Sequence, residues 1–534
     1  MNRSDAAGFG LFTAKNKTGH VKPALAALLA GGLQGTCVAW PWQTDQLFHW
    51  LGLTWGQPLW WGQLLALAML VVLLLDSHSA RQAAWRGWLF ALAWLVVSVG
   101  WLYVSMHVYG GLPGVLAVLA VLALAGTLAL YYAGACALFW PLARKDSAWS
   151  ALLFACVWLL AELARGLLFT GFGWGAVGYA HLDGPLAPTI GWVGAYGTGA
   201  VAAALAGMLA FLIRSGSMPS AMRRAGAIVM TLVAISGVTP HDGTEHGSLS
   251  VTLLQGDIPQ SEKFEQSTGV PRALRWYGEQ LQASRSALVI TPETALPLLP
   301  SQLPAGYWQT LQKRFSTGDQ AALIGVPLGS YTEGYTNSVV GFKPGQAEVW
   351  RYDKYHLVPF GEFIPPWFRW FTELMSIPLG DFNRGALPQP TFEWKGQRLA
   401  ASICYENLFG EEMATQFLDP KRAPTMFFNV SNMGWFGKHL AMDQHLQIAR
   451  MRALEFDRPF LLATNTGRTA IVDHRGHVTH AAVAHTATAL TAEVRGRTGV
   501  TPYAWWVSRF ALWPMLGLSL LVLLVAAWLR KQGT

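Results

Sequence analysis

Eight long apolar segments constrain this chain more than any other feature of its sequence. A helix needs about 20 apolar residues to cross the hydrocarbon core of a bilayer. Segments of this kind lie at residues 22–40, 58–75, 86–105, 113–139, 150–169, 188–213, 224–240 and 506–529. Only 13% of the 534 residues are charged, whereas soluble domains carry about 25%. The sequence therefore predicts a polytopic α-helical membrane bundle with eight spans.

The distribution of lysine and arginine predicts how these segments cross the membrane. Basic residues occur in the N-terminal tail, after the second, fourth and sixth segments, and at the C-terminus. The alternate loops, 41–57, 106–112 and 170–187, contain no lysine or arginine. Because basic residues concentrate in cytoplasmic loops, we expect residues 1–21 and 530–534 in the cytoplasm, and residues 241–505 on the outer side after seven spans within 22–240. The net charge of +8 follows from this topology, so it does not indicate nucleic-acid binding.

Residues 241–505 differ in character from the apolar segments on either side. Short β-rich runs lie at 249–255, 287–293, 321–327, 398–404, 425–430, 460–467 and 469–476. Helices are expected at 271–286 and 442–457, the first beginning at Pro271, where the missing N–H of proline costs nothing. About 250 residues are ample for a layered domain, and the pattern predicts an α/β domain outside the membrane.

Cys404 is the first candidate for chemistry. The apolar run from Leu399 to Ile403 ends abruptly at this cysteine, which predicts a buried strand that turns sharply and presents its last residue at the carboxyl edge of a sheet. The other three cysteines lie in apolar segments. A buried structural cysteine is the alternative on this stretch alone.

Glu293 and Lys354 are two further candidates at predicted strand ends or in adjacent loops. Glu293 ends the run ALVITPE, and Lys354 lies eight residues before Glu362 in RYDKYHLVPFGEFIP. A surface glutamate and a solvated loop lysine are the alternatives. A carboxylate near a thiol can take its proton, and an ammonium can stabilise an oxyanion. With Cys404, these residue types fit nucleophilic catalysis.

The blocks TPETALP, DKYHLVPFGEFIP and ICYENLFG, in this order, resemble the Glu-Lys-Cys signature of the nitrilase superfamily. With the eight segments and the blocks QGDIPQSEKF (255–264) and NVSNMGWFG (429–437), nearly the whole chain resembles the apolipoprotein N-acyltransferase family. The resemblance implies an α-β-β-α sandwich for the outer domain. It also implies that Glu293 is the general base, Lys354 the oxyanion stabiliser and Cys404 the acylated nucleophile. The supporting residues it implies are Glu362, which orients Lys354, and Tyr405 and Glu406, which line the site.

The resemblance also implies a reaction and its partners. An acyl chain passes from a phospholipid, phosphatidylethanolamine, to a cysteine thioester. The N-terminal α-amine of diacylglyceryl-cysteine in an apolipoprotein then takes the chain, which completes lipoprotein maturation. The resemblance implies a monomer in the bacterial inner membrane, with the catalytic domain in the periplasm. We expect no metal and no organic cofactor.

Five residues are candidates for positioning lipid: Phe264, Trp435, Trp367, Phe371 and Arg165. Trp367 and Phe371 lie in the apolar stretch 363–382, which predicts a loop dipping into the outer leaflet or an ordinary lid. Arg165 lies three residues after Glu162 in the fifth segment, so it either binds a phosphate head group or simply pairs with Glu162. Phe264 stands where the family often has Trp, and Trp435 follows Met433-Gly434 where the family usually has Asp-Ala.

Two other functions remain open from the sequence. A membrane-tethered nitrilase-like amidase would use the same three residues with water as the acceptor. A non-catalytic polytopic transporter or scaffold would not require Glu293, Lys354 and Cys404 to lie together.

Overall fold

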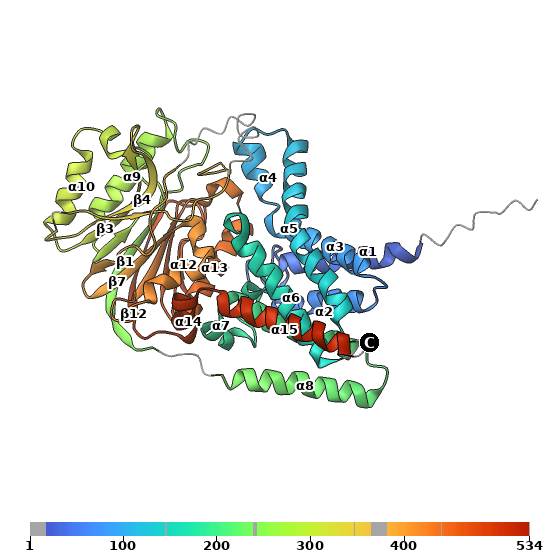
Figure 1. Ribbon diagram of the computed structural model, residues 1–534. Helices are drawn as coiled ribbons and strands as arrows, with labels where there is room; N and C mark the ends of the chain where they lie inside the picture. The colour runs from blue at the N-terminus through green and yellow to red at the C-terminus, as the bar shows by residue number, and fades with distance from the viewer. Residues whose placement is uncertain are drawn as a thin grey trace, which may run out of the picture.

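The computed structural model describes residues 18–144, 147–238, 243–346, 348–364, 382–438 and 440–532. Two parts lie side by side in Figure 1. Long helices occupy the right of the view, and two β-sheets with their own helices occupy the left. The helical part combines the first half of the chain with its last helix, as the blue-to-green and dark red colours show.

Each predicted apolar segment contains a helix. These helices are α1 (Thr18–Thr36), α2 (Trp60–Leu75), α3 (Ala80–Val99), α5 (Gly114–Leu142), α6 (Ala148–Leu167), α7 (Ile190–Ile213), α8 (Met218–Ser236) and α15 (Trp513–Gln532). Among the described residues, 6 helices are long and apolar enough to cross a membrane. α2 has only 16 residues, and α1 is not among the six. A membrane part is therefore supported, and the count of eight spans stays a prediction.

Several helix ends differ from the predicted boundaries. α8 begins at Met218, after the N-cap Ser217, and not at residue 224. α3 begins at Ala80, where Ser79 Oγ accepts a hydrogen bond from the Gln82 N–H at 3.2 Å. The predicted segment 506–529 is divided between α14 (Pro502–Phe510) and α15, with a break at Ala511, whose φ is 47°. Apolar composition locates the middle of a helix, but polar caps and backbone breaks set its ends.

The α/β part contains two six-stranded sheets, ordered β12-β1-β2-β3-β4-β5 and β11-β10-β9-β8-β7-β6. The strands are β1 (Glu245–Gln255), β2 (Leu288–Ile290), β3 (Ala321–Ser330), β4 (Gly334–Phe342), β5 (Trp350–Asp353), β6 (Phe392–Trp394), β7 (Gln397–Ile403), β8 (Met426–Ser431), β9 (Phe460–Thr464), β10 (Ala470–Val472), β11 (Val478–Ala481) and β12 (Thr488–Arg497). β1, β2 and β3 are parallel, as are β7, β8 and β9. The first strand, β1, pairs antiparallel with the last, β12.

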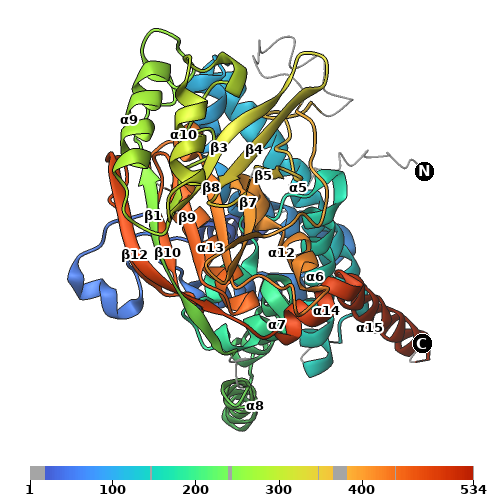
Figure 2. The same cartoon turned by 90° about the vertical axis from the view of Figure 1, so that its left-hand side faces the viewer.

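The two sheets pack face to face over a shared apolar core that includes Val251, Ile290, Ile403 and Phe428. α9 (Gly269–Ala283) and α10 (Tyr307–Ser316) pack on the outer face of the first sheet. α13 (Leu440–Phe456) packs on the second sheet, between that sheet and the membrane helices. Figure 1 shows α9 and α10 at the left, away from the membrane helices, and in Figure 2 this side of the molecule faces the viewer. The predicted α-β-β-α sandwich is confirmed. α9 begins at Gly269, two positions earlier than predicted.

The second sheet also joins the α/β part to the helical part. Leu163 of α6 and Tyr196 of α7 share one apolar core with Phe456 of α13. Another core joins Trp174, between α6 and α7, with Tyr405 at the end of β7. The edge where β7 ends is thereby packed against the segment between α6 and α7. Most of the predicted loop 363–382, with Trp367 and Phe371, lies outside the described residues.

Candidate active site

Cys404 lies where β7 ends and the short helix η8 (Cys404–Leu408) begins. Its φ is 52°, a left-handed conformation that costs a non-glycine residue on the order of 1–3 kcal/mol and is found at functional sites. Asn429 Nδ2, from β8, holds the turn by donating to the Cys404 carbonyl oxygen at 3.2 Å. Cys404 is partly exposed, whereas Ile403 and Tyr405 on either side are buried. The predicted sharp turn is confirmed, and it presents the thiol at the edge of the sheet.

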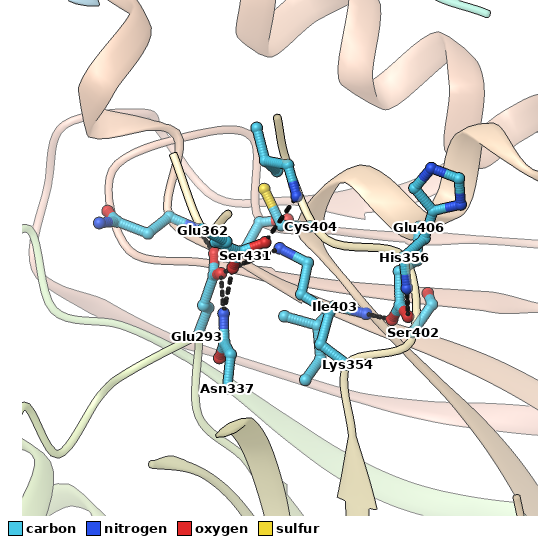
Figure 3. Close-up of polar contacts among 12 residues, drawn as sticks. Glu293, Asn337, Lys354, His356, Glu362, Ser402, Ile403, Cys404, Glu406 and Ser431 are labelled. Atoms are coloured by element: carbon cyan, nitrogen blue, oxygen red, sulfur yellow. Dashed lines mark hydrogen bonds and ion pairs between the residues drawn. The ribbon is translucent and has the colours of Figure 1, made fainter. Parts of the chain in front are cut away.

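Glu293 and Lys354 reach the same edge from the first sheet. Glu293 follows β2 and Lys354 follows β5, and their side chains are 10% and 1% exposed. Lys354 Nζ lies 3.7 Å from Glu293 Oε1. Figure 3 shows Glu293, Lys354 and Glu362 gathered beside the sulfur of Cys404. The structure therefore brings together three residues that a non-catalytic scaffold would have no reason to join.

Hydrogen bonds hold the two carboxylates of this cluster in place. Asn337 Nδ2, from β4, donates to Glu293 Oε1 at 2.7 Å and to Glu362 Oε1 at 2.8 Å. The backbone N–H of Asn432 donates to Glu293 Oε2 at 2.8 Å. Lys354 Nζ donates to Glu362 Oε1 at 2.8 Å. Because each Glu293 oxygen has a donor, its carboxylate is fixed in orientation beside the thiol.

The cluster also sets the resting protonation of the lysine and the thiol. Burial by itself would lower the pKa of Lys354, but the carboxylates of Glu362 and Glu293 more than offset it, and the pKa is raised. Burial raises the pKa of the Cys404 thiol, Glu293 raises it further, and Lys354 only partly opposes them. At neutral pH the site therefore holds an ammonium and a neutral thiol, so the thiol needs a base when it attacks.

Glu406 and Tyr405 fasten the backbone around the site. The Glu406 carboxylate accepts hydrogen bonds from the backbone N–H groups of Ile403 (2.6 Å), Tyr355 (2.7 Å) and His356 (3.0 Å). It thus ties the residues after Lys354 to the turn at Cys404. Burial raises the pKa of Glu406 to about 7, against the opposing effects of Lys354 and these N–H groups. Tyr405 Oη donates to the Gly171 carbonyl at 3.0 Å, in the segment between α6 and α7.

Comparison with known proteins identifies both parts of the chain. Residues 49–208 match the family model of the apolipoprotein N-acyltransferase N-terminal domain, and residues 250–503 match that of carbon-nitrogen hydrolases. An apolipoprotein N-acyltransferase from Verminephrobacter eiseniae is 51% identical over 510 residues, which cover 91% of this chain and 92% of the relative. One from Ralstonia nicotianae is 43% identical over 483 residues, covering 89% of this chain and 90% of the relative.

The chain belongs to the apolipoprotein N-acyltransferase family. It is thus an acyltransferase with a carbon-nitrogen hydrolase domain, and the resemblance found in its motifs is confirmed.

Two of the candidate lipid-positioning residues of this acyltransferase lie near the active-site elements. Phe264 is 47% exposed and follows Lys263, whose Nζ bonds the Glu293 carbonyl at 2.9 Å. Trp435 lies in the short helix η10 (Met433–Phe436), and its ring is 5.6 Å from that of Tyr109 in the helical part. The Trp435 ring borders the junction between the two parts, and the lipid contacts of both rings stay a prediction.

Arg165 of the acyltransferase is buried and bonded to backbone carbonyls, and its contact with a phosphate head group stays a prediction. Its side chain is only 1% exposed, and Nη1 donates to the carbonyls of Phe172 (2.6 Å) and Trp174 (2.7 Å). Glu162 Oε1 accepts from the Val177 N–H at 2.9 Å, and no ion pair joins Glu162 to Arg165 within the described ranges. The pairing expected from their spacing is therefore wrong. Instead, both charged side chains form hydrogen bonds with backbone groups that have no helical partner after the end of α6.

Sequence reasoning missed Asn337, Asn432 and Lys263 as members of the site. Asn337 lies in β4, a strand that the apolar pattern does not indicate. Asn432 and Lys263 lie in blocks that carried the family resemblance, but Asn432 acts through its backbone N–H, for which a sequence has no signal. In the described ranges, no group of three or more His, Cys, Asp and Glu side chains could hold a metal ion.

Proposed function

We propose that this acyltransferase moves an acyl chain from a membrane phospholipid, through a thioester on Cys404, to the α-amine of an N-terminal diacylglyceryl-cysteine in apolipoproteins. The observation that carries this proposal is the buried Glu293–Lys354 pair, 3.7 Å apart, beside a partly exposed thiol. The resemblance to the family supports phosphatidylethanolamine as the donor. The resemblance to the family also supports a monomer.

In the first half-reaction, Glu293 takes the thiol proton while the Cys404 sulfur attacks the carbonyl carbon of a phospholipid ester. The oxyanion that forms is stabilised by the Lys354 ammonium, which Glu362 holds at 2.8 Å. The C–O bond then breaks. Glu293 returns the proton to the leaving oxygen, so a lysophospholipid departs and the chain remains as a thioester.

In the second half-reaction, the free α-amine attacks the thioester carbon, and Lys354 again stabilises the oxyanion. The C–S bond breaks, the amide leaves, and Glu293 passes a proton from nitrogen to the cysteine sulfur. A thioester keeps the activation of the original ester, so the transfer needs no nucleotide. Water in place of the amine would give the hydrolase alternative.

We also propose eight spans in the bacterial inner membrane, both termini in the cytoplasm, and residues 241–505 in the periplasm. The three loops without lysine or arginine all contact the α/β part, which supports one common side. Gly56 O accepts from Gln447 Nε2 at 2.6 Å, Tyr109 packs on Trp435, and Thr170 O lies 2.8 Å from His356 Nε2. At the other ends of α2 and α7, Asp76 pairs with Arg214.

Mass spectrometry of the intact protein after incubation with phosphatidylethanolamine vesicles tests this function. We expect one added acyl chain on the wild-type protein, which a diacylglyceryl-cysteine peptide removes with formation of the triacylated peptide. Cys404→Ala should give no adduct, and Cys156→Ala, which removes a cysteine of α6, serves as the matched control. Release of free fatty acid with no acylated peptide would favour the hydrolase, and the absence of any adduct would overturn the thioester route.

A further inference from the structure

Lys263 is a second buried lysine at the active site, and the steps above do not use it. Its side chain is 2% exposed, and its Nζ donates to the backbone carbonyl of Glu293 at 2.9 Å. The segment that carries it is fixed to the second sheet. Asn465, which follows β9, bonds the backbone N–H and C=O of Ile258 at 3.1 and 2.8 Å.

The two lysines of the site have different surroundings. Lys354 Nζ has carboxylate oxygens at 2.8 and 3.7 Å, from Glu362 and Glu293. Lys263 forms no ion pair with a carboxylate within the described ranges, and its partner is a neutral peptide carbonyl. A buried ammonium without a close counter-ion is costly, so such a lysine is biased toward its neutral form.

The electrostatics agree with this difference in surroundings. Burial lowers the pKa of Lys263 to about 8, although the two titratable groups that face it, Glu293 and Cys404, act in the opposite direction. The pKa of Lys354 is raised. Where two like groups in one site are pushed apart in pKa, they are suited to different roles in acid–base chemistry.

The second half-reaction needs a base in addition to Glu293. An α-ammonium has a pKa of about 8 and carries three N–H bonds, whereas the amide product keeps one. Two protons therefore leave the nitrogen. One ends on the Cys404 sulfur and the other goes to solvent. The first half-reaction moves a single proton, from the thiol to the departing lysophospholipid oxygen, and Glu293 can carry that proton alone.

We propose that Lys263 is the second base of the site and acts only in aminolysis, an inference that rests on the proposed function. The neutral Lys263 amine accepts one proton from the incoming α-ammonium, and the free amine then attacks the thioester. Glu293 takes the second proton from nitrogen and gives it to the sulfur as the C–S bond breaks. The Lys263 ammonium then loses its proton to water, beside the half-exposed Phe264.

The decisive variant is Lys263→Arg in the full-length protein, because arginine keeps the charge and the hydrogen-bond donors but does not give up a proton. We expect acylation of Cys404 by phosphatidylethanolamine vesicles to stay within about twofold of wild type. Aminolysis of the acyl-enzyme by a diacylglyceryl-cysteine peptide should slow at least about 100-fold, at the lower end of general-base effects. Hydroxylamine, which is already neutral at neutral pH, should cleave the same acyl-enzyme at the wild-type rate.

Lys343→Arg is the matched control, since Lys343 Nζ also donates to the backbone carbonyl of a glutamate, Glu393, at 2.6 Å. It should leave both half-reactions unchanged. If Lys263→Arg forms no acyl-enzyme, Lys263→Met is judged by the same ratio of the two rates. Equal slowing of both half-reactions, or unchanged aminolysis, overturns this inference alone. A wild-type protein that forms no acyl-enzyme overturns the proposed function and this inference with it.

Discussion

Two clusters of buried charge lie in the α/β part, and they differ in what surrounds them. At the edge of the sheets, Glu293, Glu362 and Lys354 lie beside a partly exposed thiol. At the junction with the helical part, Arg452 and Glu455 are 2% and 0% exposed, with Arg452 Nη1 2.7 Å from Glu455 Oε2. Both clusters contain carboxylates and a cation, so charge and burial alone do not distinguish a catalytic site.

The second cluster supports a broken helix. α7 departs from helical geometry at Gly194, whose φ is 64° and where a Cβ would lie 2.3 Å from the Tyr503 ring. Glu455 Oε1 accepts a hydrogen bond at 2.7 Å from the N–H of Ala195, the next residue. The Glu455 carboxylate at the junction thus accepts a hydrogen bond from a backbone N–H. The Glu293 carboxylate at the edge of the sheets lies beside the reactive thiol of Cys404. The comparison teaches that a buried ion pair indicates chemistry only where a nucleophile can reach it.

The largest expected effect comes from removing the base at the edge. Glu293→Gln keeps the shape of the side chain but cannot accept the thiol proton, so the rate of Cys404 acylation should fall about 10³-fold. Stopped-time mass spectrometry of the acyl-enzyme measures this rate. The unfolding temperature should stay close to wild type. Retained acylation would remove the distinction between the two clusters.

Removing the cation at the edge should have the next largest effect. Lys354→Met loses the stabilisation of both oxyanions, and we expect kcat for acyl transfer to fall by about 10²–10³-fold. Binding of phospholipid, measured as KM, should change little, because the ammonium acts mainly in the transition state. A change confined to KM would instead place Lys354 in lipid binding.

At the junction, removing a buried charged side chain should lower the free energy of unfolding and leave the rate of acylation unchanged. Glu455→Ala leaves Arg452 buried without its partner and the Ala195 N–H without an acceptor. The free energy of unfolding should therefore fall by about 3 kcal/mol. Unfolding in detergent micelles measures the loss, with the exposed Glu279→Ala on α9 as control. The acylation rate per folded molecule should remain near wild type. A fall in that rate at unchanged stability would mean that this cluster also acts in catalysis.

The junction should also be sensitive to pH. Burial raises the pKa of Glu455 to about 7, despite the opposing Arg452. Above the ordinary pKa of a glutamate the unfolded chain loses this proton, whereas the folded protein loses it, and forms the full charge pair with Arg452, only as the pH approaches 7. Stability should therefore fall as pH rises from 5 to 7, by about 2–3 kcal/mol. Glu455→Gln should flatten this slope, and an unchanged slope would show that other groups cause it.

The smallest expected effect concerns the link between the two regions. Tyr405→Phe removes the hydrogen bond from Tyr405 Oη to Gly171 O and keeps the ring. The free energy of unfolding should fall by about 1 kcal/mol. We expect acylation to slow by no more than about fivefold, measured with the same vesicles. A loss as large as that of Glu293→Gln would mean that Tyr405 contacts the reacting groups.

The sequence predicts the strands and residues whose burial depends on apolar side chains. β7 and β8 each contain a short, mainly apolar run, as expected for parallel strands covered on both faces, and the ends of such runs indicated Cys404 and Glu293. β4 escaped prediction because Thr336, Asn337 and Ser338 are buried by hydrogen bonding, for example Ser338 Oγ to Asp353 Oδ1 at 2.6 Å. β12 escaped because it alternates, with one face exposed.

Contacts between segments that are distant in the sequence explain the other predictions that were wrong or missing. Arg165 and Glu162 have a spacing that favours pairing, but tertiary structure offers each of them free backbone groups between residues 172 and 177. Lys263 has no local signal, because the carbonyl it bonds belongs to Glu293, in the loop after β2. Spacing along one element predicts local contacts only, and the active site is made of contacts between elements.

The pairing of β1 with β12 has a consequence for the ancestry of the chain. Leu249 lies opposite Val494, so the polypeptide enters and leaves the sandwich through neighbouring strands. A unit whose ends meet can be spliced between two consecutive helices with little disturbance to their packing. An ancestral water-soluble enzyme could acquire a bilayer anchor in this way through gene fusion, without rebuilding its interior.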